Sequence, residues 1–196
     1  MTLNREQKCL LEFVKECHGE QKRKYSMAPY WTHVYSVADL ASFHVKDAGV
    51  VEIALCHDLF EDTACDDKLL KAKLMEIGYH AVLMDTIING VTELTDVYTK
   101  ENYPEFNRKE RKHKEAIRLG GISKMAQSIK YADLTDNATS IAAGEPGFAR
   151  IYLREKIDIL NQMRQGNINL LIDCCYTLKF CLKQLDMELG DTRKRV

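Results

Sequence analysis

Residues 50–63 read VVEIALCHDLFEDT, and this stretch decides the fold because it joins a helical apolar pattern to a cluster of charges. Its first half is almost entirely apolar or small, which is typical of a helix buried on most sides. His57 and Asp58 continue the apolar run, and Glu61 and Asp62 follow one turn later. Buried charges are tolerated mainly when they are paired or bound to a metal. We therefore predict one continuous helix, ending at about Asp62, that carries a polar site.

Two other segments place polar residues on apolar helical faces. Asp133 occupies a position where the apolar stripe of its helix calls for a leucine, and His33 adjoins the apolar face of a helix opened by Pro29. Taken singly, such a histidine is more often a hydrogen-bonded core residue, and Asp133 could cap a helix or pair with an arginine. Together with His57 and Asp58 they form a nitrogen–oxygen set without thiolates, which favours a Mn, Fe or Zn site over a structural zinc.

Helical periodicity dominates the rest of the chain, and alternating strand patterns are scarce. We expect an all-α fold, a single bundle of roughly eight to ten helices over residues 1–185. The predicted helices cover about 4–17, Pro29 to beyond Ala41, 50–62, 67–77, 80–88, 105–119, 122–138, 147–164 and 167–185. Residues 92–107 are predicted to form a surface loop, and the charged tail 186–196 is predicted to be frayed.

The amino-acid composition limits the expected location of the protein and its expected binding partners. The 196 residues are 45% hydrophobic, enough for one domain with a real core, and the net charge of -1 gives no general attraction to nucleic acid or membranes. No stretch is apolar enough to span a bilayer, and the start MTLNREQKCLLEF lacks the apolar region of a secretion signal. The seven cysteines form no CxxC pair and are expected to be reduced. We expect a soluble, cytoplasmic protein.

The order of His33, His57-Asp58 and Asp133 resembles the HD superfamily of metal-dependent phosphohydrolases. The sequence is most similar to the hydrolase domain of the RelA/SpoT stringent-response enzymes and to the small alarmone hydrolases. Four segments between residues 18 and 137 carry this resemblance: HGEQKRK…PYWTHVYSVA, ALCHDLFEDT, INGVTEL and IKYADLTDN. ALCHDLFEDT is the most specific of them.

The resemblance implies a site for one Mn²⁺ ion, with Fe or Zn as alternatives, held by His33, His57, Asp58 and Asp133. It implies that Glu61 and Asp62 orient or deprotonate the attacking water. It also implies a set of substrate contacts: Arg23 and Lys24 on the base-binding side, Asn137 against the nucleotide, Arg108 against a phosphate and Tyr152 in the pocket. For the basic stretch around Arg108, a solvated helix face is an equal alternative.

The chain departs from the family pattern beside the base pocket. Residues 25–28 fill a loop where the family has a glycine, and Val34 replaces the usual proline after the first histidine. These changes leave the metal ligands intact. The preference for guanine or adenine therefore stays open. The sequence also leaves the oligomeric state open.

The implied reaction is hydrolysis of the 3′-pyrophosphate of (p)ppGpp or a related alarmone, giving GDP or GTP and pyrophosphate. The length leaves no room for a synthetase domain, so we expect hydrolysis alone, with a separate alarmone synthetase as a candidate partner. Removal of pyrophosphate from tRNA 3′ ends is a minor alternative, which the near-neutral charge disfavours. Two other hypotheses are a different HD phosphohydrolase (a 5′-nucleotidase or a dinucleotide 2′-phosphatase) and a non-catalytic nucleotide-binding HD protein.

Overall fold

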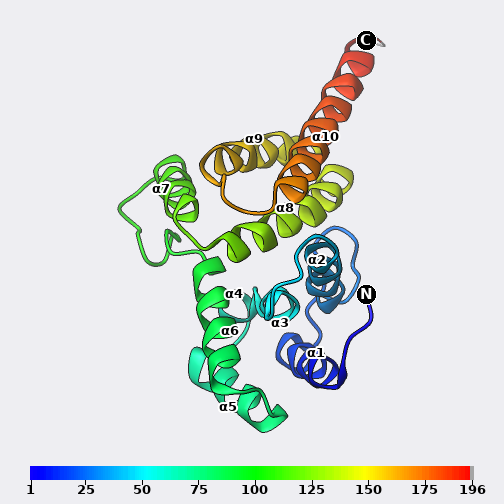
Figure 1. Ribbon diagram of the computed structural model, residues 1–196. Coiled ribbons are helices and arrows are strands. Elements are labelled where there is room, and N and C mark those ends of the chain that lie inside the picture. Colours follow the sequence, from blue (N-terminus) through cyan, green and yellow to red (C-terminus); the bar gives the residue numbers. More distant parts are fainter. Residues whose placement is uncertain (195–196) are drawn as a thin grey trace.

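The fold is all-helical, as the periodicity predicted. The computed structural model describes residues 1–194, and this part of the chain contains ten helices and no strand (Figure 1). The helices are α1 (Arg5–His18), α2 (Trp31–His44), α3 (Val50–Cys56), α4 (Leu59–Asp62), α5 (Asp67–Ile77), α6 (Ala81–Leu94), α7 (Arg108–Gly120), α8 (Lys124–Gly144), α9 (Pro146–Gln162) and α10 (Ile168–Lys194). The predicted number of eight to ten helices is confirmed.

Helix α8 forms the centre of the bundle. It packs against α2, α3 and α6 on one side and against α9 and α10 on the other, and Figure 1 shows it running between these two groups. Every residue from 126 to 134 is buried, so α8 is enclosed around its whole circumference there. A polar residue in this stretch, such as Asp133, therefore lies inside the protein and needs partners.

The predicted continuous helix over residues 50–62 is wrong, because the chain breaks it into α3 and α4. The junction consists of His57 and Asp58. Asp58 has φ -99° and ψ 0°, in the sparsely populated bridge region where active-site residues are often found. His57 keeps helical angles, with φ -58° and ψ -29°. Because the distortion is confined to one residue, the apolar periodicity of the stretch gives no sign of it.

Several other boundaries differ from the prediction. Helix α6 continues through Gly90 to Leu94, and Gly90 allows close packing against α3, since a Cβ there would lie 2.5 Å from Ile53 Cδ1. Helix α2 begins two residues after Pro29, and α10 runs past residue 185 to Lys194. Residues 195 and 196 of the predicted frayed tail lie outside the described residues, so its fraying stays a prediction.

Two further expectations concerned disulfide bonds and membrane-spanning helices. All seven cysteines are free thiols, as their spacing predicted. Within residues 1–194, no helix combines the length and the apolar character needed to cross a membrane.

Candidate functional site

The four predicted metal ligands come together where α2, α8 and the α3–α4 junction meet. His33 Nε2 lies 3.5 Å from Asp58 Oδ2 and 3.4 Å from Asp133 Oδ1. His57 Nε2 lies 3.2 Å and 3.9 Å from the same two oxygen atoms. Neighbouring ligands of an octahedral ion with bonds of about 2.1 Å are about 3 Å apart, so these atoms are close to a coordinating arrangement. His33, His57 and Asp58 satisfy the spacing of a metal-binding group by themselves.

The two histidines present free nitrogen atoms to this site. Both Nε2 atoms are buried, and among the described residues neither has a hydrogen-bond partner. His57 Nδ1 lies 2.8 Å from the carbonyl oxygen of Ala54, and His33 Nδ1 lies 2.7 Å from Asp136 Oδ2. Such acceptors hold the proton on Nδ1 and leave the Nε2 lone pair for a metal. The residues therefore fit a divalent cation.

Each anionic ligand is held by a neighbour. The Tyr30 hydroxyl donates to Asp58 Oδ2 over 2.7 Å, and Asn137 Nδ2 donates to Asp133 Oδ1 over 2.6 Å. Lys130 Nζ lies 2.9 Å from the other Asp133 oxygen. Sequence reasoning missed Tyr30, Lys130 and Asp136, although the last follows Asp133 by one helical turn on the same face of α8.

The acidic and basic side chains of this buried centre compensate one another's charges. Burial opposes ionisation of Asp133, but Lys130 and the two histidines outweigh it and hold its pKa well below the usual range. Burial also opposes the charged form of His33, yet the carboxylates of Asp133, Asp136 and Asp58 raise its pKa to about 9. A metal ion would replace the histidine protons, so metal binding here is coupled to proton release.

Glu61 and Asp62, the predicted acidic pair, end α4 three and four residues after Asp58, and both side chains are exposed. Glu61 Oε1 accepts a hydrogen bond from the backbone N–H of Asp96 over 2.8 Å. Desolvation by the surrounding protein raises the pKa of Glu61 to about 7. The charge of Lys130 opposes this rise, and the charges of Asp96 and Asp58 add to it. Asp62 Oδ2 accepts from Gln21 Nε2 over 3.2 Å, so the loop after α1 fixes its carboxylate.

Arg23 lies beside the metal centre, whereas Lys24 is on the surface. Arg23 Nη2 lies 2.5 Å from Asp136 Oδ2 and donates to Ser140 Oγ over 2.6 Å. Lys24 Nζ is 3.1 Å from the Glu145 carboxylate at the end of α8. Arg23 therefore connects the predicted base-binding loop directly to the residue that holds His33.

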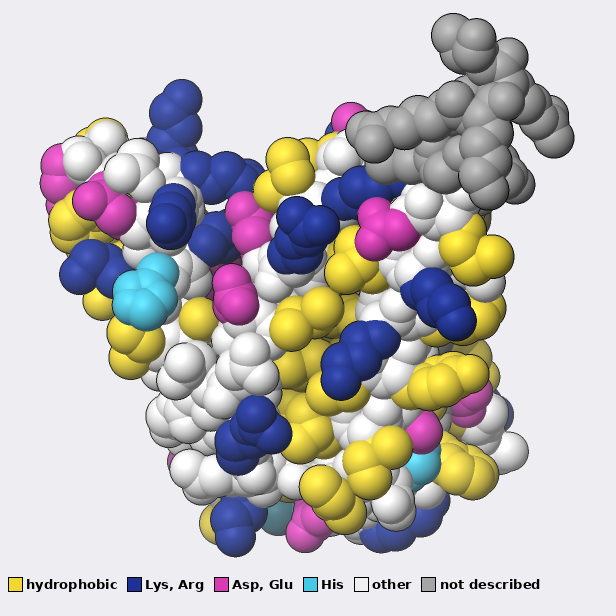
Figure 2. All heavy atoms as spheres, turned by 90° about the horizontal axis from the view of Figure 1, so that it is seen from above, with side chains coloured by type: hydrophobic (Ala, Val, Ile, Leu, Met, Phe, Trp, Pro, Cys, Tyr) yellow, Lys and Arg dark blue, Asp and Glu magenta, His cyan; other side chains and the backbone are white. Residues whose placement is uncertain are grey.

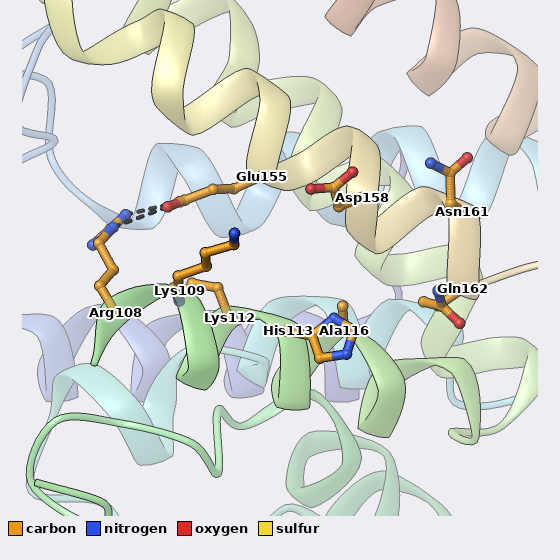
Figure 3. A pocket seen from close by; sticks show the side chains of 9 residues that line it. All are labelled: Arg108, Lys109, Lys112, His113, Ala116, Glu155, Asp158, Asn161 and Gln162. Carbon is orange, nitrogen blue, oxygen red and sulfur yellow. Dashed lines mark hydrogen bonds and ion pairs between the residues drawn. The ribbon is translucent and has the colours of Figure 1, made fainter. Parts of the chain in front are cut away.

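The other two predicted substrate residues, Arg108 and Tyr152, belong to α7 and α9 respectively. Tyr152 is half-buried on α9, and burial together with the charge of Asp133 raises its pKa. Arg108 instead donates two hydrogen bonds to the Glu155 carboxylate, over 2.9 and 2.8 Å. Figure 3 shows this pair at one end of a pocket between α7 and α9. The volume of the pocket is about 550 Å³. The pocket is lined by Arg108, Lys109, Lys112, His113, Ala116, Glu155, Asp158, Asn161 and Gln162.

Comparisons with known proteins test the resemblance and the fold. No protein-family model matches the sequence. Over 98 residues, half of this chain, the sequence is 34% identical to a guanosine-3′,5′-bis(diphosphate) 3′-pyrophosphohydrolase of Aquifex aeolicus (strain VF5). The match spans only 13% of that relative's length.

A solved structure is also similar to the chain. It belongs to a metazoan ortholog of SpoT described as hydrolysing ppGpp and acting in starvation responses. The TM-score is 0.73 at 23% identity, covering 91% of this chain and 97% of that one, so this likeness establishes the fold. The resemblance inferred from the sequence is confirmed: the chain has the all-helical fold of a ppGpp hydrolase and, over half its length, resembles an alarmone pyrophosphohydrolase in sequence.

Proposed function

We propose that the protein hydrolyses the 3′-pyrophosphate of (p)ppGpp or a closely related alarmone, releasing GDP or GTP and pyrophosphate. One observation carries this proposal: the unpartnered Nε2 atoms of His33 and His57 converge on Asp58 and Asp133 beside an acidic pair. The names of the relative and of the structural neighbour support the choice of substrate class. A purely nucleotide-binding protein would have no use for such a pair next to a metal site.

The residues that would hold the metal are His33, His57, Asp58 and Asp133. We propose manganese, since nitrogen and oxygen ligands without thiolate suit hard-to-borderline divalent ions. When bound, the cation would polarise a phosphoryl oxygen and lower the pKa of a water molecule.

Glu61 is the proposed general base. A base works best when its pKa is near the working pH, and a value of about 7 meets that condition. Asp62, held by Gln21, would accept a hydrogen bond from the other O–H of the water and orient it for attack. Glu61 would take the proton at its carboxylate and release it to solvent, which both side chains reach.

Lysines beside the metal centre suit a substrate rich in phosphate. Lys130 Nζ lies 2.9 Å from Asp133 Oδ2, and burial with the charges of Lys130 and Lys112 lowers the pKa of Lys156 to about 8. Figure 2 views the molecule from above and shows Lys and Arg side chains spread over that face, interspersed with Asp and Glu. We propose that these lysines offset the phosphate charge. Tyr152 and Asn137 would contact the nucleotide, and Arg108 would exchange Glu155 for a phosphate.

A direct test uses metal-free protein reconstituted with Mn²⁺ and incubated with ppGpp or its adenine counterpart. We expect GDP or ADP to accumulate, as followed by ion-exchange chromatography. Asp58→Ala should neither bind Mn²⁺ nor consume the alarmone, because it removes one of few anionic ligands. An Asp58→Ala variant with normal turnover would show that this site is not the active site.

A further inference from the structure

Helix α10 is apolar on two sides, only one of which packs against the rest of the protein. Its inner face is buried and consists of Leu170, Leu171, Cys174, Leu178, Cys181 and Leu185. Its outer face carries a second apolar row, the α10 stripe, made of Ile168, Ile172, Tyr176, Phe180 and Met187. Each stripe residue is at least 49% exposed. A surface helix normally presents a polar outer face, so a row of this kind marks an interaction surface.

We propose that the α10 stripe pairs with the same stripe of a second copy of this chain, in antiparallel orientation. A twofold axis at the level of Leu178 brings Tyr176 of one copy opposite Phe180 of the other, since these residues lie two positions to either side of it. Within one chain the two rings already stack, with their centroids 6.2 Å apart. A twofold pair would therefore place four aromatic rings at the centre of the interface, where anchor residues contribute most.

Charge complementarity favours the antiparallel orientation and a second copy of the chain as the binding partner. Asp173 and Lys183 lie five positions to either side of Leu178, and both are exposed. In the antiparallel pair, Asp173 of each copy faces Lys183 of the other, which gives two attractive contacts. A parallel pair would place like charges opposite each other. A surface that complements itself in both shape and charge suits a closed twofold dimer.

The position of α10 leaves room for such a partner. Figure 1 shows that its C-terminal half extends beyond the other helices. None of the metal-centre residues lies on α10, since they come from α2, the α3–α4 junction and α8. Dimer formation can therefore be measured without substrate, and the result does not depend on the proposed hydrolysis.

The first experiment measures mass by light scattering during size-exclusion chromatography. We expect a dimer at about 100 µM chain, a concentration that populates interfaces of micromolar affinity. Tyr176→Ala with Phe180→Ala should weaken association at least tenfold, while circular dichroism and ppGpp turnover stay unchanged. A monomeric wild-type protein at that concentration, or a dimer indifferent to the double substitution, would overturn the proposal.

The second experiment tests the pairing through charge. Asp173→Lys and Lys183→Asp should each weaken the homodimer roughly tenfold, because each turns two attractive contacts into repulsive ones. An equimolar mixture of the two variants should form a heterodimer, in which both contacts become attractive again, and the protein carrying both changes should regain the homodimer. Asp173 Oδ2 also lies 3.6 Å from His44 Nε2, so His44→Gln is the control and should stay dimeric. Failure of both the mixture and the double variant to associate would exclude the proposed register.

Discussion

Asp136 Oδ2 lies 2.7 Å from Nδ1 of His33, on the side of the imidazole ring that faces away from the other ligands. This contact fixes both the ring orientation and the nitrogen that carries the proton. The same carboxylate oxygen pairs with Arg23, which follows α1 in the chain. The candidate metal centre is thus supported by Asp136, a residue that the sequence motifs did not single out.

Asp136→Asn should weaken metal binding by about 10- to 100-fold, the usual effect of removing a carboxylate behind a histidine ligand. Isothermal titration with Mn²⁺ measures this affinity. Asp85→Asn, an exposed acid on α6, is the matched control and should bind metal normally. Equal affinities in the two variants would mean that Asp136 does not position His33.

Arg23→Ala is expected to raise KM, as the base-pocket hypothesis predicts, and also to lower metal affinity, because Asp136 loses its cation. Lys24→Ala should leave metal affinity unchanged, since its partner Glu145 lies at the far end of α8. Measuring KM and Mn²⁺ affinity on both variants separates substrate binding from support of the metal. A normal KM and a normal metal affinity in Arg23→Ala would remove Arg23 from the site.

Glu61→Gln and Asp62→Asn should keep the fold and most of the metal but lose turnover. We expect kcat to fall by about 10²- to 10⁴-fold, the range for a lost general base, with little change in KM. Steady-state kinetics together with metal analysis check this. Near-normal kcat in both variants would favour the binding-protein alternative.

The raised pKa of Glu61 predicts two opposite pH effects. Turnover should fall about tenfold per pH unit below about 7, because the base is then protonated. The stability of the metal-free protein should show the reverse trend. A carboxyl group whose pKa is higher in the folded state than in the unfolded state contributes fully to the free energy of unfolding below its unfolded-state pKa. That contribution is lost as the pH rises through the folded-state pKa of about 7. Glu61→Gln should therefore raise the melting temperature at pH 8 by a few degrees at most and leave it unchanged at pH 4. A lower melting temperature at pH 8 would contradict this.

The sequence predicted the fold and a set of candidate metal ligands that lie together in the structure, because charge on an apolar helical face is costly and therefore informative. Asp133 on the enclosed α8 is the clearest case. Asp136 and Tyr30 were missed because half-buried polar residues break no pattern. The Arg108–Glu155 pair joins two helices far apart in the sequence, and only the packing of α7 on α9 shows it.

The central claim is tested most directly by identifying the phosphate released from ppGpp by the Mn²⁺-loaded protein. An enzyme-coupled assay for pyrophosphate, run beside one for orthophosphate, measures both products in the same sample. The account predicts one pyrophosphate for each GDP formed and none from Glu61→Gln over the same period. Release of orthophosphate alone, or binding of ppGpp without either product, would contradict it.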